Sequence, residues 1–386
     1  MAAYYVKAKK IIVGDALEPK ENAGLLIQDG KIAAIYDEMS SLPIPEGAQV
    51  LDYGEATLIP GMIDCHNHLA LDTRLENHLV KMEDCEAEQT IRAVKTMRDD
   101  LVSGVTTSRC CGDRFYVDVT CRNAQRQGRL MGPKLVVSGI GMRAAHGHGY
   151  VGMPHTGVLE FQKRSRENIL RGVDFLKVFT TKVINATPFI FHFMTPEELK
   201  AVVTEARSVN LPTACHCSGG QGLNDCVEAG IDCLEHVYYI TPEQVELVKK
   251  TDRWVTYTPS YALNDTLLFK FSPKDREGSL KEKEIIIGCL SNAIQGGLKF
   301  GIGTDGIHQG LAQEACYISQ LGAANRDVLA GVTINAARLC RVDEKTGSIA
   351  VGKAADLVAV AGDPLADIEA LKKVTAVIQD GNIIVS

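Results

Sequence analysis

Apolar and polar residues follow two different patterns along the chain. Near both ends, short segments rich in alternating apolar positions are typical of half-buried β-strands. They cover residues 4–13, 23–28, 31–36 and 49–58 at the start and 356–360, 374–379 and 382–385 at the end. Asp29-Gly30 and Asp380-Gly381 are hairpin turn signals between strands. The shared pattern predicts one small β-sandwich domain built from residues 1–59 and 340–386.

In the middle of the chain, apolar runs alternate with helical stretches. The strand candidates are residues 58–65, 105–110, 134–140, 175–180, 212–217, 233–239, 254–259 and 299–304. Helix candidates separate most of them, at residues 86–103, 116–127, 195–209, 222–229, 242–249 and 280–295. Repeated strand–helix units predict an α/β fold, and eight strands in roughly 250 residues match a (β/α)₈ TIM barrel. We therefore predict this barrel over residues 60–339. A doubly wound open sheet is disfavoured because no G-x-G-x-x-G motif follows the first strand.

The composition is that of an ordinary soluble protein, with 45% apolar residues, 23% charged residues and a net charge of −7. No basic run suggests a nucleic-acid partner, and no apolar stretch has the length of a membrane span. The N-terminus lacks the apolar core of a signal peptide, so we expect a cytoplasmic protein with reduced cysteines. A small molecule is therefore the expected substrate.

Residues that bind metals follow several of the apolar runs. His66 and His68 end the first barrel strand, and strand alternation puts both side chains on one face. His216, His236 and Asp305 lie at the ends of the fifth, sixth and eighth strands. In a barrel these strand ends meet at one rim, where active sites form. Four imidazoles and a carboxylate suit Zn²⁺, with Mn²⁺, Fe²⁺ and Co²⁺ as competitors.

Lys177 lies inside the apolar run of the fourth strand. An unpaired ammonium in that position would be unfavourable, which suggests a functional role. A lysine that extends its amine to solvent is an equal alternative from this residue alone.

These residues and their surroundings resemble the amidohydrolase superfamily, over essentially the whole chain. Pro60-Gly61-Met62-Ile63-Asp64 leads into the paired histidines, and Gly303-Thr304-Asp305 ends the eighth strand. Gly352-Lys353-Ala354-Ala355-Asp356-Leu357 matches the tail of such proteins. The nearest branch is that of the Xaa-Pro dipeptidases, with related carboxypeptidases and imidazolonepropionase-like enzymes.

The resemblance implies a binuclear metal-dependent hydrolase that cleaves an amide bond in a dipeptide, an N-acyl amino acid or a similar small substrate. It assigns the ligands of two divalent cations, most simply Zn²⁺: His66, His68 and Asp305 for one, His216 and His236 for the other, and a carboxylated Lys177 that bridges them. A hydroxide shared by the cations would attack the carbonyl carbon, with Asp305 as general base and then general acid. Homo-oligomers are also expected from the family.

Two contacts to the substrate are implied less directly. The dipeptidase branch has a Gly-Gly-His-Gly segment after the third strand, whose histidine contacts the scissile carbonyl. Here Ala144-Ala145 replaces the glycines, and either His146 or His148 is the counterpart; we favour His146. Tyr239 matches the spacing of a tyrosine that stabilises the oxyanion. Simple packing in a loop is the alternative for both.

Three other functions are weighed against the amide hydrolase. A mononuclear deaminase of the same superfamily typically has a glutamate three residues after the fifth-strand histidine and no fourth-strand lysine. This chain has Gly219 and Lys177 instead. Hydrolysis of a cyclic amide or a lactone stays open because of the departure at Ala144-Ala145. A metal-free assembly protein is the alternative outside enzymes, but relatives of that kind have lost the ligands that this chain keeps.

Overall fold

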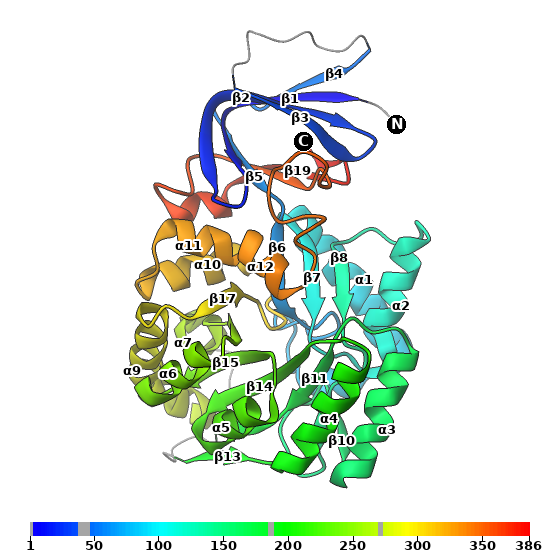
Figure 1. Cartoon of the computed structure of the whole chain (residues 1–386), viewed down its shortest axis with the longest axis vertical. Helices are drawn as coiled ribbons and strands as arrows, with labels where there is room; N and C mark the ends of the chain where they lie inside the picture. The colour runs from blue at the N-terminus through cyan, green and yellow to red at the C-terminus, as the bar shows by residue number, and fades with distance from the viewer. Residues whose placement is uncertain (1–2, 38–46, 184–188, 269–272) are drawn as a thin grey trace.

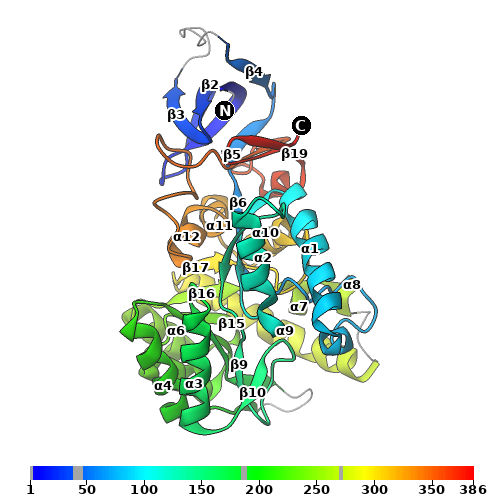
Figure 2. The same ribbon diagram turned by 90° about the vertical axis from the view of Figure 1, so that its right-hand side faces the viewer.

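The molecule is elongated, with strands from both chain ends at one end and helix-covered strands at the other (Figure 1). The computed structural model describes residues 3–37, 47–183, 189–268 and 273–386. Figure 2, turned by a right angle, shows the N- and C-terminal ends of the chain in the same sheet. Among the described residues, no helix has the length and apolarity needed to cross a membrane.

The strands from both ends of the chain pair in one eight-stranded sheet, the terminal sheet. Its order is β20-β19-β18-β5-β1-β2-β3, with β4 paired to β1. The strands are β1 (Tyr4–Val13), β2 (Glu18–Gln28), β3 (Lys31–Tyr36), β4 (Gln49–Asp52), β5 (Thr57–Pro60), β18 (Leu357–Val360), β19 (Val374–Gln379) and β20 (Asn382–Val385). A Cβ on Gly30 would lie 2.8 Å from the Asp380 carbonyl oxygen, so the two hairpin turns approach closely only because one is glycine. The apolar side chains of the terminal sheet form a separate core, in which Ile11, Leu25 and Leu58 are fully buried.

The central strands form two parallel sheets. The larger has the order β10-β9-β11-β14-β15-β16-β17 and the smaller β6-β7-β8. Their bounds are β6 (Met62–Asn67), β7 (Val105–Cys110), β8 (Lys134–Val137), β9 (Met142–Ala144), β10 (Met153–His155), β11 (Leu176–Phe179), β14 (Thr213–Gly219), β15 (Cys233–Tyr239), β16 (Trp254–Tyr257) and β17 (Lys299–Ile302). The antiparallel pair β12 (Thr181–Val183) and β13 (Ile190–His192) stands apart from both. Each of the eight predicted central strands has a counterpart, except that residues 58–60 of the first one belong to β5 of the terminal sheet.

Main-chain hydrogen bonds connect the two parallel sheets on both sides. The amide of Asp174, just before β11, donates to the Val137 carbonyl of β8 over 2.7 Å. The amide of Asp305, just after β17, donates to the His66 carbonyl of β6 over 2.7 Å. The first and last central strands therefore lie next to each other, although more than two hundred residues separate them in the sequence.

Helices alternate with the central strands and cover their outer surface (Figures 1 and 2). The helices are α1 (Glu86–Val102), α2 (Val117–Arg126), α3 (Gly157–Leu170), α4 (Pro196–Ser208), α5 (Gly220–Ala229), α6 (Pro242–Lys250), α7 (Ser260–Leu263), α8 (Asp265–Leu268), α9 (Pro273–Gln295), α10 (Leu311–Gln320), α11 (Asn325–Gly331) and α12 (Ile334–Leu339). Short 3₁₀ segments are η1 (Val80–Glu83), η2 (Arg114–Tyr116) and η3 (Ile368–Lys372). Capping boxes at Thr195 and Thr241 start α4 and α6 where the sequence predicts them. Helix α9 begins seven residues before its predicted start. The prediction missed these first turns because residues 273–279 include no large apolar side chain.

Strand alternation divides the central side chains between two environments. Leu176 and Val178 of β11 are fully buried in the main apolar core. Lys177, between them, points the other way, toward His66 of β6, and His216 of β14 also faces away from this core, between Cys215 and Cys217. The fold thus collects polar groups on the inner side of the sheets.

Candidate active site

A cavity of about 320 Å³ lies at the carboxyl ends of the central strands. Five of the predicted metal ligands line it: His66, His68, His216, His236 and Asp305. They come from β6, β14, β15 and the turn after β17, so only the parallel arrangement of the strands brings them together. All but Asp305 and His216 are almost fully buried.

The donor atoms at the centre of this cavity are close enough to share a cation. The Asp305 carboxylate lies 3.4 Å from Nε2 of His66 and 3.3 Å from Nε2 of His68. Donor atoms of His66, His236 and Asp305 all fall within 4.8 Å of one another. The His216 and His236 rings have their centroids 4.5 Å apart. Because zinc–ligand bonds are about 2.0–2.2 Å long, donors spaced in this way fit around divalent metal ions.

A buried ion pair orients His66. Its Nδ1 lies 2.8 Å from Oε2 of Glu235, and the other oxygen of Glu235 lies 2.9 Å from Nη1 of Arg109. Burial alone would raise the pKa of Glu235, but Arg109 and His66 hold it well below its usual range. The ionised carboxylate directs Nε2 of His66 toward the cavity, as carboxylates behind metal-binding histidines commonly do. The sequence prediction missed Glu235, although an acidic residue next to His236 inside an apolar strand was a signal.

A hydrogen bond at Nδ1 fixes the ring orientation of two more histidines, His68 and His236. Nδ1 of His68 lies 2.6 Å from the carbonyl oxygen of Gly112, which can only accept, so this nitrogen carries the proton. Nδ1 of His236 lies 2.7 Å from the hydroxyl of Thr258. Each ring therefore turns its Nε2 toward the cavity, where it can bind a metal.

Lys177 is fully buried beneath the cavity. Its Nζ lies 3.5 Å from Nε2 of His66 and 5.0 Å from the centre of the Phe179 ring. Among the described residues, no carboxylate lies within ion-pair distance of this amine. The alternative in which the amine reaches solvent is therefore wrong. An unmodified ammonium this close to Nε2 of His66 would repel a cation bound there, whereas an anionic derivative would attract one.

The backbone is strained where the ligands meet. His236 has a φ of 77° and Asp305 a φ of 53°, values that non-glycine residues adopt uncommonly. A Cβ on Gly303 would lie 2.4 Å from the Cβ of His66, so glycine is required for β17 to approach β6. Strain of this kind often accumulates where a structure must aim specific side chains.

The histidine next to the ligands is His148 rather than the favoured His146. His146 is exposed, packs edge-on against Phe193 with centroids 5.3 Å apart, and does not line the cavity. His148 lines the cavity, with its ring centroid 4.8 Å from that of His216. Burial and the nearby Lys182 lower the pKa of His148 to about 4, so it is neutral at pH 7. The preference for His146 is corrected on this geometry.

Two tyrosines line the same cavity. Tyr239, which the sequence predicts to stabilise the oxyanion, lines the cavity, but its hydroxyl donates to Glu282 over 2.7 Å. Tyr238 stacks on His236 with centroids 5.5 Å apart, and its hydroxyl lies 2.8 Å from that of Thr258. In this arrangement both hydroxyls hold neighbouring side chains.

A lysine and a serine complete the polar wall. Lys182 of β12 and Ser218 of β14 both line the cavity. The amine of Lys182 has no ion pair or hydrogen bond with any residue that the structure describes. The amide of Ser218 is held by the Thr181 hydroxyl at 2.7 Å, which fixes this part of the wall. No local pattern in the sequence distinguishes Lys182 from a surface lysine, and the prediction missed it.

Comparison with known proteins extends over nearly the whole chain. A model of the amidohydrolase family matches residues 57–384. Ochratoxinase from Aspergillus niger is 27% identical over 418 residues, covering 96% of this chain and 84% of that protein. Imidazolonepropionase from Thermoplasma acidophilum is 24% identical over 407 residues, covering 95% and 90%. The crystal structure of a Xaa-Pro dipeptidase with methionine in its active site superposes with a TM-score of 0.86 at 24% identity, covering 99% of both chains.

Proposed function

The chain belongs to the amidohydrolase family, and we propose that it is a binuclear metal-dependent hydrolase that cleaves an amide bond next to a carboxylate in a small substrate. One observation carries this proposal: histidines from β6, β14 and β15 and Asp305 surround one cavity, with the buried Lys177 beneath them. Dipeptides and N-acyl amino acids are the substrates of this kind that we expect.

The proposal includes the architecture that presents this site. We take the two parallel sheets as parts of one closed (β/α)₈ barrel over residues 60–339, with the terminal sheet as a separate β-sandwich domain. The hydrogen bonds from Asp174 to Val137 and from Asp305 to His66 support closure on both sides. Barrel enzymes place their active sites at the carboxyl ends of the strands, as here.

The residues fit two divalent cations. His66, His68 and Asp305 would hold one, His216 and His236 the other, and a carboxylated Lys177 would lie between them. Zn²⁺ is the first candidate because the donors are imidazole nitrogens and carboxylate oxygens. Bound there, the cations would activate a water molecule and polarise the substrate carbonyl.

Asp305 is the residue that we assign to proton transfer. Burial alone would raise the pKa of its carboxyl group, but the surrounding His66, His68 and His236 hold it well below its usual range. An ionised carboxylate can accept a proton from water and then deliver it to the leaving amine. His148, neutral at pH 7, can donate a hydrogen bond to the substrate carbonyl from beside His216.

The position of Lys182 indicates a substrate that carries a carboxylate. It is a cation without a partner among the described residues, in a cavity whose other walls include the apolar side chains of Leu71, Leu79 and Ile286. A substrate carboxylate would pair with this ammonium, while an acyl group or apolar side chain would contact the aliphatic wall. This arrangement favours an amide substrate that releases an amino acid over a neutral lactone substrate.

The test is a screen of the metal-loaded enzyme with three substrate sets: N-acyl amino acids with dipeptides, the same compounds with the carboxylate blocked as an amide, and lactones. We expect turnover of the first set, weaker turnover of the second and about two metal ions per chain by elemental analysis. Release of ammonia from an aminated ring with one metal per chain would instead identify a deaminase. A chain that binds no metal would refute the proposal.

A further inference from the structure

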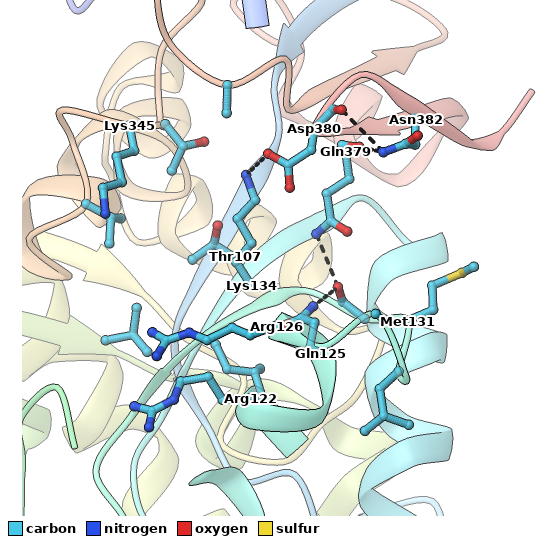
Figure 3. A pocket seen from close by; sticks show the side chains of 18 of the residues that line it. Thr107, Arg122, Gln125, Arg126, Met131, Lys134, Lys345, Gln379, Asp380 and Asn382 are labelled. Atoms are coloured by element: carbon cyan, nitrogen blue, oxygen red, sulfur yellow. Dashed lines mark hydrogen bonds and ion pairs between the residues drawn. The ribbon is translucent and has the colours of Figure 1, made fainter. Parts of the chain in front are cut away.

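A second, larger cavity separates the terminal sheet from the amino-terminal parts of the central strands. Its volume is about 1050 Å³ (Figure 3). Its walls come from β7 and β8, the end of α2, residues 342–354 and the β19–β20 hairpin. None of its lining residues belongs to the cavity that holds the predicted metal ligands. It is called the basal cavity below.

The basal cavity is strongly cationic in a chain of net charge −7. Six lysines and arginines line it against two acidic residues: Lys31, Arg122, Arg126, Arg129, Lys134, Lys345, and Glu344 with Asp380. Lys134 is neutralised, since its amine lies 2.8 Å from Asp356 and 2.6 Å from Asp380. Arg122 is also held, with Nη1 2.7 Å from the carbonyl oxygen of Gly172.

Four of these cations have no such partner. Lys31, Arg126, Arg129 and Lys345 make no side-chain hydrogen bond or ion pair with any residue that the structure describes. They come from β3, α2, the loop after α2 and the segment before β18, and Figure 3 shows Arg126 and Lys345 reaching into the cavity from different elements. Among the described acidic residues of this lining, only Glu344 is left to offset these four cations, so an excess of positive charge faces the cavity.

A buried hydroxyl in the same wall also lacks a partner. Thr107 is 1% exposed, and its Oγ1 makes no hydrogen bond among the described residues. It lies on β7 opposite Lys134 of β8 and lines the cavity (Figure 3). Buried hydroxyls are rarely left without hydrogen bonds, so this one indicates a missing acceptor.

Apolar side chains occupy the rest of the wall. Leu130, Leu135, Val136 and Ile384 line the cavity, and Met131 is 60% exposed at its edge. The size and the mixture of apolar surface with a few polar groups are those of small-molecule sites, which often lie between domains.

We propose that the basal cavity binds a small organic anion with more than one negative charge. Lys345, Arg126, Arg129 and Lys31 take its charged groups, Thr107 donates its hydroxyl to one of their oxygens, and the apolar wall contacts the carbon skeleton. This site is independent of the hydrolase function.

Isothermal titration calorimetry of the metal-loaded enzyme with naphthalene-1,3,6-trisulfonate tests the proposal, because sulfonates are weak metal ligands. We expect saturable binding at one site per chain that weakens as salt rises. The double variant Arg126→Gln/Lys345→Gln should bind about tenfold more weakly, since two charge interactions are lost. Lys200→Gln on α4 is the matched control, because Lys200 is exposed and its amine has no partner among the described residues. This variant should bind within about twofold of wild type.

Thr107→Val provides a test that does not change charge. It should weaken binding about threefold or more while leaving the melting temperature unchanged or higher, because the hydroxyl has no partner without the ligand. Hydrolysis of an N-acyl amino acid, followed in parallel, should be unaffected by either variant. Unsaturable binding, or a double variant that binds like wild type, would overturn the proposal. The proposal would also be overturned if the wild type did not bind the probe and the double variant sedimented as a smaller species than the wild type. The cavity would then be a contact between copies of the chain.

Discussion

The two cavities of this protein differ in whether their charged groups are buried and paired. At the cavity at the carboxyl ends of the strands, His66 is buried, and so is the Glu235–Arg109 ion pair that contacts it from behind. In the basal cavity, Arg126 and Lys345 are exposed and have no partner among the described residues. The first cavity is also the smaller, at about 320 Å³ against about 1050 Å³.

This difference suits the first cavity to catalysis and the basal cavity to ligand binding. Burial and mutual contact shift pKa values and fix the directions of ring nitrogens, and both are needed for proton transfer and metal binding. Exposed charges can attract a ligand through solvent, but they cannot polarise a bond to the same extent. Volume alone would point to the wrong cavity as the catalytic one.

The largest expected effect comes from neutralising Asp305. Asp305→Asn should lower kcat about 10²- to 10⁴-fold, because the group that transfers the proton is lost. Circular dichroism and the melting temperature should stay close to wild type, and metal content must be measured alongside turnover. Asp252→Asn, an exposed residue paired with Lys299, is the matched control. Turnover within tenfold of wild type would remove Asp305 from its assigned role.

Replacing Glu235 should weaken metal binding without changing any of the proposed metal ligands. Glu235→Gln keeps the shape but loses the charge that orients His66 and pairs with Arg109. Metal affinity, measured by competition with a chelator, should fall about 10- to 100-fold. Glu246→Gln on α6, which is exposed, should leave affinity unchanged. Equal affinity in the two variants would show that the buried ion pair only supports the fold.

Lys182→Gln should affect substrate binding more than turnover. We expect KM for substrates with a carboxylate to rise about tenfold, which corresponds to about 1.4 kcal/mol, with little change in kcat. Substrates with a blocked carboxylate should show no difference between wild type and variant, which gives an internal control. Should both substrate sets lose activity alike, Lys182 does not bind the carboxylate.

The smallest effect is expected from the basal cavity. Arg126→Gln/Lys345→Gln should leave kcat/KM for amide hydrolysis within about twofold of wild type, because exposed charges at the other end of the strands act weakly over that distance. Steady-state kinetics in low and physiological salt would check this. A large loss of kcat/KM would mean that the two cavities are coupled.

Much of the fold was predictable because local signals are strong where a helix or strand begins. Thr195 and Thr241 cap the two helices that the sequence predicts at residues 195–209 and 242–249. That the four histidines proposed as ligands share one cavity was predictable for a related reason, since each follows an apolar run at a strand end. Lys182 gave no such signal, because it lies on β12, outside the main sheets. The choice between His146 and His148 was not decidable either, since both lie in one glycine-containing loop whose path is set by its neighbours.

The amino-acid sequence by itself determined which faces are apolar, where the strands and helices run and which residue types stand at the strand ends. These follow from hydrophobic periodicity and capping, which act over a few residues. Only the tertiary structure decided that Glu235 stands behind His66, that His148 reaches the cavity of the predicted metal ligands, and that Thr107 and Lys345 share a second cavity. Those are distances between residues far apart in the chain, set by how strands pair and pack, and no local pattern carries them.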